Sequence, residues 1–209
     1  MKSSYLRSAA ALLLTLSLAA CGGGGIGGKA QYTIQGTISN LSNSGLVLSS
    51  NSMTVAPAAG DTTFTFPKTI DYGTEFNVIV ATQPNHMTCT PGYDANSSAG
   101  HTVAIDATIT CVQNSYYVTG TISGLTVAGL ILGNGSATTL TPIAAATTFQ
   151  MPDLVNDGVS YGITVLAQPA GLTCTVSNGS GTVGGSNITG IANGGLATTA
   201  VVVTCVPTT

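Results

Sequence analysis

Two histidines and an aspartate between them are the residues of this sequence best suited to bind a metal ion. His86 and His101 lie on either side of Asp94. Imidazole nitrogens and carboxylates are common zinc ligands, and the oxygen-rich segment 94–98 has the donor atoms of a weak calcium site. Exposed turns explain the same residues, because both histidines follow turn-forming residues and acids often stabilise turns. We therefore expect no metal site and no cofactor.

Catalysis by hydrolysis requires a base that a partner group holds in position. Residues 116–207 contain no His, Glu, Lys or Arg, and their acids, Asp153 and Asp157, fit turn chemistry. The sequence also has no Gly-x-Ser-x-Gly motif of the kind that carries a serine nucleophile. We expect no catalytic residues and a protein that is not an enzyme. An enzyme that uses His86 or His101 is a further alternative.

The chain that must position these residues consists of two copies of one repeat. After a shift of 84 residues the segment 32–48 recurs, and after a shift of 85 residues the segment 64–90 recurs. Residues 32–113 are called the first repeat below, and residues 116–207 the second repeat. Neither histidine has a counterpart in the second repeat, so neither belongs to the shared fold.

Both repeats alternate apolar and polar residues with a period of two, which is typical of β-strands. The segment 76–81 has apolar residues on both faces, so we expect it to be buried on both sides. Gly, Pro, Asn and Asp separate the runs, and no stretch after the N-terminal segment keeps helical spacing. About seven short strands in each repeat are typical of a sandwich. The predicted fold class is all-β, with two tandem antiparallel β-sandwich domains.

The N-terminal residues have the pattern of an export signal. Lys2 and Arg7 precede an apolar run over residues 9–20. A helix of this length spans about 18 Å, which is too short for a hydrocarbon core of about 30 Å. A basic start, a short apolar run and small residues at its end are typical of a cleaved signal peptide.

The end of this signal, Leu18-Ala19-Ala20-Cys21, resembles the lipobox of bacterial lipoproteins. The resemblance implies a signal peptide over 1–20 and a mature chain that begins with Cys21. This cysteine would carry a thioether diacylglycerol and an amide-linked acyl chain, and several acyl chains give a stable membrane anchor. Residues 21–31 then form a Gly-rich linker. An ordinary cleaved signal next to a free cysteine is the alternative.

Charged residues make up only 5% of the 209 residues, against about 25% in an average soluble domain. This composition excludes a coiled coil, and the formal net charge of −3 disfavours binding to nucleic acid. Without the signal peptide, Lys29 and Lys68 remain against seven acids, so the net charge becomes 2 − 7 = −5.

The other four cysteines occur as one pair in each repeat, at matched positions. In an exported chain such pairs predict disulfides. We expect the bonds Cys89–Cys111 and Cys174–Cys205. A zinc site is the alternative, but the pairs lack the short Cys-x-x-Cys spacing of zinc knuckles.

The shared motifs of the repeats, among them Gly-Thr-Ile-Ser, Gln-Pro and Thr-Cys-Thr, resemble an Ig-like repeat of bacterial surface lipoproteins, specifically proteobacterial ones. The Phe-x-Phe-Pro motif and the residues after it are also similar to prealbumin-like sandwiches, so the strand order is open. The resemblance implies a stalk or structural module and transfers no catalytic residue.

Together these features predict a non-enzymatic lipoprotein that acts as a structural, display or adhesion module of the cell envelope. Its expected partner is the membrane, through the lipid on Cys21, and the outer membrane if the host is Gram-negative. The alternative is a recognition module for a glycan or a protein, which uses the Gly-rich loop 177–195. Seven glycines make this segment the most loop-like part of the mature chain.

Overall fold

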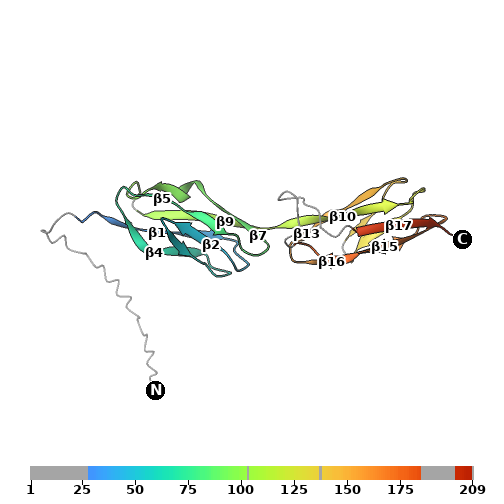
Figure 1. Ribbon diagram of the computed structural model, residues 1–209, viewed down its shortest axis with the longest axis horizontal. Coiled ribbons are helices and arrows are strands. Elements are labelled where there is room, and N and C mark those ends of the chain that lie inside the picture. Colours follow the sequence, from blue (N-terminus) through green and yellow to red (C-terminus); the bar gives the residue numbers. More distant parts are fainter. Residues whose placement is uncertain (1–27, 103, 137, 185–200, 209) are drawn as a thin grey trace, which may run out of the picture.

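The structure is a computed structural model that describes residues 28–102, 104–136, 138–184 and 201–208 (Figure 1). Within these ranges the secondary structure is β-strand, apart from the 3-10 turn η1 (Tyr93–Ala95). No helix in the described ranges is long and apolar enough to span a membrane. The predicted all-β fold class is therefore confirmed. The signal peptide and Cys21 lie outside the described residues.

Short strands separated by tight turns fill both repeats, and Figure 1 shows the repeats arranged end to end. The first repeat contains β1 (Gln31–Ser39), β2 (Val47–Ser50), β3 (Met53–Val55), β4 (Thr63–Asp71), β5 (Glu75–Asn77), β6 (Ile79–Thr82), β7 (Met87–Pro91), β8 (Asn96–Ser98) and β9 (Ile105–Gln113). The second repeat contains β10 (Ser115–Ser123), β11 (Ile131–Asn134), β12 (Thr138–Leu140), β13 (Thr148–Asn156), β14 (Ser160–Ala167), β15 (Leu172–Ser177), β16 (Ser180–Thr182) and β17 (Val201–Pro207).

One four-stranded sheet recurs in both repeats with the same strand order. It is β4-β1-β9-β7 in the first repeat and β13-β10-β17-β15 in the second. In each sheet the first and last strands of the repeat run parallel, β1 with β9 and β10 with β17, whereas the other pairs are antiparallel. The predicted antiparallel arrangement therefore does not extend to this pair of strands in either repeat. Alternation identifies a strand and its faces, but it carries no information about which distant strand lies beside it.

The opposite layer differs slightly between the repeats. In the first repeat it consists of the sheet β3-β2-β6 and the two-stranded ribbon β5–β8, and in the second of the sheet β12-β11-β14-β16. The strand β14 is continuous, but its counterpart breaks into β5 and β6 at Val78, whose N–H donates to the carbonyl of Ala95. Ile79 is 46% exposed, so the segment 76–81 is buried on one side only and the expectation of two buried faces was wrong.

The first two strands of each repeat lie in different sheets: β1 and β10 in the four-stranded sheet, β2 and β11 in the opposite layer. In the immunoglobulin constant-type order, the first two strands share one sheet. The strand order observed here differs from that arrangement in both repeats.

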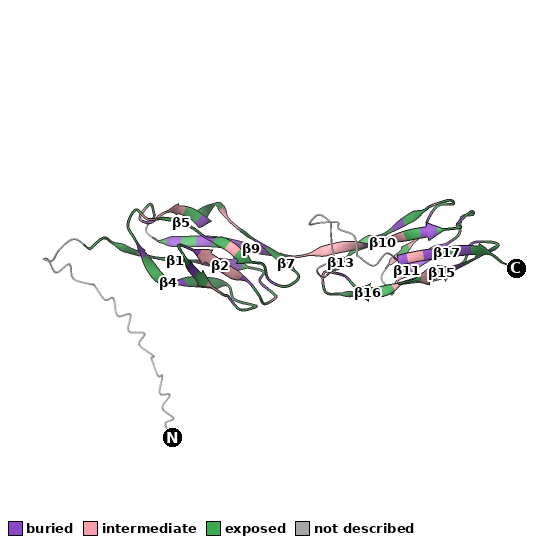
Figure 2. Cartoon of the chain, in the orientation of Figure 1, coloured by how far each residue is buried: buried purple, intermediate pink, exposed green. Residues whose placement is uncertain are grey.

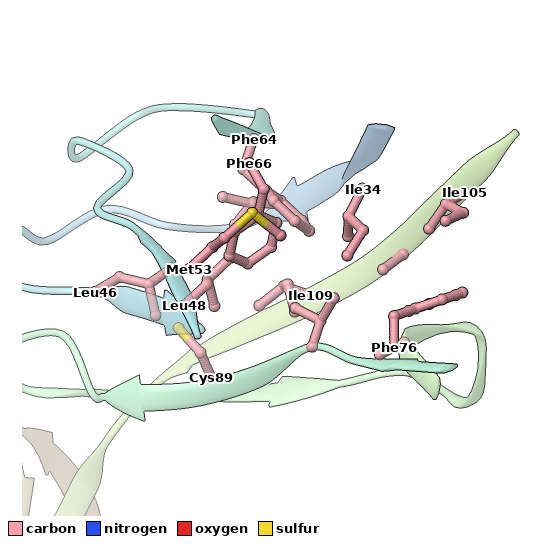
Figure 3. Close-up of a cluster of buried hydrophobic side chains, with 14 of the residues drawn as sticks. Ile34, Leu46, Leu48, Met53, Phe64, Phe66, Phe76, Cys89, Ile105 and Ile109 are labelled. Carbon is pink, nitrogen blue, oxygen red and sulfur yellow. The ribbon is translucent and has the colours of Figure 1, made fainter. Parts of the chain in front are cut away.

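Inward-facing side chains form two hydrophobic clusters, one in each repeat, and the two clusters share no residue among those described. Figure 2 shows buried and exposed residues alternating along β9, as the period of two requires. In the first cluster, shown in Figure 3, side chains from both layers meet, including Phe64 and Phe66 from β4 and Leu48 from β2. Each repeat thus buries its own core.

Candidate functional site: the junction between the repeats

Each repeat contains the disulfide that the sequence predicts, Cys89–Cys111 in the first and Cys174–Cys205 in the second. Both bonds join residues that lie directly opposite each other on neighbouring antiparallel strands, β7 with β9 and β15 with β17. All four cysteines are buried. Each disulfide thus ties an edge strand of the four-stranded sheet to the strand beside it.

A single residue, Asn114, separates the last strand of the first repeat from the first strand of the second, because β9 ends at Gln113 and β10 begins at Ser115. The Asn114 N–H donates to the carbonyl of His86 at 2.9 Å, which lies in the first repeat. The Asn114 carbonyl accepts from the N–H of Asp157 at 2.9 Å, which lies in the second repeat. The linking residue is therefore bonded to both sides of the junction.

Side chains add further contacts across the same junction. The Nδ1 atom of His86 lies 3.0 Å from Oδ1 of Asp157. Gln113 Nε2 donates to the backbone carbonyl of Asp157 at 3.2 Å, and Thr88 Oγ1 donates to the side-chain oxygen of Asn114 at 2.7 Å. The Asp157 side chain is 11% exposed and that of His86 is 47% exposed. The carboxylate is thus the covered member of the pair.

Two tight turns bring this pair together. His86 has a φ of +60° in the turn between β6 and β7, a conformation that His tolerates better than most residues other than Gly. Gly158 has a φ of +87° in the turn after β13. A Cβ atom on Gly158 would lie 3.2–3.3 Å from atoms of the His86 ring, so the absence of a side chain lets the imidazole approach.

The charge of Asp157 also reaches Tyr116 near the start of β10. Burial, and secondarily the negative charge of Asp157, raises the pKa of Tyr116 above its ordinary value of 10.0. Both effects act against the phenolate, because removal from water and a nearby like charge each disfavour the charged form.

The His86–Asp157 pair has no equivalent elsewhere in the repeats. With the shift of 85 residues, Gly171 takes the place of His86 in the second repeat. Tyr72 takes the place of Asp157 in the first. The position at the junction explains why the histidine is absent from the shared pattern. The sequence pattern predicts turns at both His86 and Asp157, and no local signal indicates their contact.

The metal-binding combination considered in the sequence does not assemble, because its three residues contact different partners. The Asp94 carboxylate accepts from the N–H and the hydroxyl of Thr108, at 3.1 and 2.9 Å. His101 lines a shallow hollow of about 340 Å³ together with Glu75 and β8. Within the described residues, no group of three His, Cys, Asp or Glu side chains is placed to hold a metal ion.

The segment 177–195, expected to be a loop, lies partly in β-strands where the structure describes it. Ser177 ends β15, and Ser180–Thr182 form β16, which pairs antiparallel with β14. Residues 185–195 lie outside the described residues. The pairing of β16 depends on a strand about twenty residues earlier, and its glycine content gave no sign of it.

The junction is suited to hold two folded units in place, because its polar groups bond to one another across the link. No protein-family model matches this chain, and no curated protein is significantly similar to it. The functional conclusion therefore depends on the geometry of the chain itself.

Proposed function

We propose that this protein is a non-enzymatic, lipid-anchored spacer of the cell envelope that displays or supports other envelope components. The observation that carries this proposal is the junction at Asn114, where hydrogen bonds to both repeats surround a link of one residue. A short, hydrogen-bonded link keeps consecutive units at a fixed separation, whereas a flexible linker would not. Fixed separation is the property that a stalk or display module requires.

The proposal treats each repeat as one independent β-sandwich domain. Separate hydrophobic clusters and a disulfide in each repeat support this division. Because β1 and β2 lie in different sheets, the strand order favours the prealbumin-like alternative over the immunoglobulin constant-type order.

Membrane attachment through Cys21 is the second part of the proposal, with the outer membrane as destination in a Gram-negative host. Its support is the lipobox-like sequence that ends at this cysteine and the Gly-rich stretch after it. Residues Gly28–Ala30, at the end of this stretch, are exposed and precede β1. Such a stretch would let the folded repeats stand away from the lipid.

A non-enzymatic role agrees with the use that the chain makes of its ionisable groups. His86, the strongest candidate for a general base, is engaged with Asp157 at the junction. Asp94 is bound to Thr108, and Asp61 accepts from the N–H of Ala58 at 2.8 Å in a turn. These contacts give the groups structural roles.

The test is an intact mass of the protein purified from its own host, measured before and after reduction. We expect loss of residues 1–20, a mass increment for the lipid and a gain of four hydrogens on reduction. A full-length or unlipidated product would overturn the anchored spacer. A product whose mass does not increase on reduction would show that the disulfides are absent.

The edge strand β16 favours a second candidate function, recognition of a protein partner. It lies at the end of the sheet β12-β11-β14-β16, and its three residues are exposed. Exposed strand edges can accept a further strand from another chain. Thr182 lies at a position of β16 whose N–H faces away from β14, because the neighbouring pairs Val183–Val159 and Tyr161–Gly181 carry the ladder bonds. Saturable binding of an envelope protein that is lost when Thr182 is replaced by Pro, with the fold kept, would support this function over the spacer alone.

A further inference from the structure

We propose that His86 and Asp157 form a clasp that fixes the orientation of the second repeat relative to the first. This inference deepens the spacer function proposed above and rests on it. Both residues act by positioning the repeats, and the clasp is the side-chain contact between them.

Asp157 directs its polar groups toward the first repeat and the link. Its carboxylate lies 3.0 Å from the His86 imidazole, its N–H donates to Asn114 and its carbonyl accepts from Gln113. A carboxylate that is 11% exposed loses most of its hydration, so it requires a hydrogen-bond partner. His86 is that partner, which makes the contact costly to break.

A second contact between the repeats, in addition to the covalent link at Asn114, restricts their relative orientation. Asn114 by itself would leave torsional freedom at the only covalent connection between the repeats. The His86–Asp157 contact comes from two turns at the side of this connection, one before β7 and one after β13. Two attachment points at different places restrict bending and twisting that one would allow.

The residues needed for the clasp occur only at this junction. At the corresponding positions of the other repeat, Gly171 has no side chain and Tyr72 has no carboxylate. The turn glycine, by contrast, is shared, since Gly73 corresponds to Gly158 and both have positive φ. The shared turn is thus part of the fold, and the His–Asp pair is an addition specific to the joint.

The test measures residual dipolar couplings on the full chain, with Cys21→Ser in all samples to prevent lipidation. We expect a single alignment tensor to fit both repeats of the parent protein. His86→Asn keeps a residue that tolerates positive φ but shortens the side chain, and Asp157→Ala removes the carboxylate. Each variant is expected to require two different tensors, one for each repeat.

The double variant should be no more mobile at the joint than either single variant, because both changes remove the same contact. His101→Asn and Asp153→Ala change the same residue types away from the junction, and both should keep the single tensor. A single, unchanged tensor in His86→Asn and Asp157→Ala would overturn the clasp and leave the spacer standing. Two independent tensors in the parent protein would instead overturn the fixed spacing on which the spacer function rests.

Discussion

At the scale of single residues, Asp157 is the point on which the junction converges. It contacts His86, Gln113 and Asn114, and its charge reaches Tyr116. Its effect on Tyr116 and its approach to the imidazole each lead to a test.

The raised pKa of Tyr116 makes stability depend on alkaline pH. The folded protein holds the phenolic proton more tightly than the unfolded chain, so this stabilisation is complete below about pH 10 and is lost as pH rises through the folded pKa. We expect Tyr116→Phe to reduce the fall in unfolding free energy above about pH 10, measured by urea unfolding at several pH values. Parallel pH profiles for the two proteins would contradict the assignment. Asp157→Ala should lower the pKa of Tyr116 without restoring it fully, because burial is the larger cause.

Gly158 and Gly73 provide a matched pair of turn glycines. Both have positive φ, +87° and +79°, so an alanine at either position costs roughly 1–2 kcal/mol of conformational energy. Only at Gly158 would the new Cβ also meet the His86 ring, since nothing lies within 4 Å of the corresponding atom at Gly73. We expect both variants to unfold at lower urea concentration, and Gly158→Ala alone to loosen the junction in residual dipolar couplings. Equal effects on the junction would show that the imidazole does not depend on this close approach.

At the scale of strands, each repeat has a parallel pair in the middle of its recurring four-stranded sheet. A disulfide joins one edge strand of that sheet to its neighbour. The backbones of the parallel neighbours β1 and β9 approach closely in the middle of β1, where a Cβ on Gly36 would overlap the backbone carbonyl oxygen of Ala107. Gly120 on β10 is in the same situation against Val201. The glycine that interrupts the apolar alternation in each repeat is therefore where the last strand approaches the first.

Removing the disulfide tests how far it stabilises each repeat. The chain-entropy account gives about 3–4 kcal/mol for sequence separations of 22 and 31 between the paired cysteines. We expect Cys89→Ala with Cys111→Ala to lose about that amount in the first repeat, and Cys174→Ala with Cys205→Ala slightly more in the second. Urea unfolding followed by NMR signals of each repeat measures the two losses separately. A loss that spreads equally to the unmodified repeat would mean that the repeats unfold as one unit.

At the scale of the whole molecule, the two repeats are arranged end to end (Figure 1), and the proposed spacer would add a lipid on Cys21 and the short Gly-rich stretch before them. Beyond Lys68 the chain has no lysine or arginine, so electrostatic attraction to anionic lipid contributes little there. Membrane attachment therefore depends on the lipid proposed for Cys21.

Replacing this cysteine tests the anchor directly. We expect Cys21→Ala to lose the lipid mass and to move from the membrane fraction to the soluble fraction, because no other part of the proposal holds the chain at a bilayer. Gly22→Ala is the matched control, since it changes the next residue and keeps the nucleophilic sulfur. Unchanged membrane association of Cys21→Ala, measured by fractionation and immunoblotting, would remove the anchor from the proposal.

The sequence by itself determined the all-β class, the two repeats and the partners of the four cysteines. These features depend on local alternation and on matched spacing, which are visible without knowledge of distant contacts. Only the tertiary structure decided the parallel pairing of β1 with β9 and the contact of His86 with Asp157, residues 71 positions apart. Alternation specifies which way a side chain faces, but the neighbour of a strand or a turn depends on how the whole chain packs. Only the tertiary structure shows the candidate site, because it forms where the two repeats, each with its own hydrophobic cluster, meet.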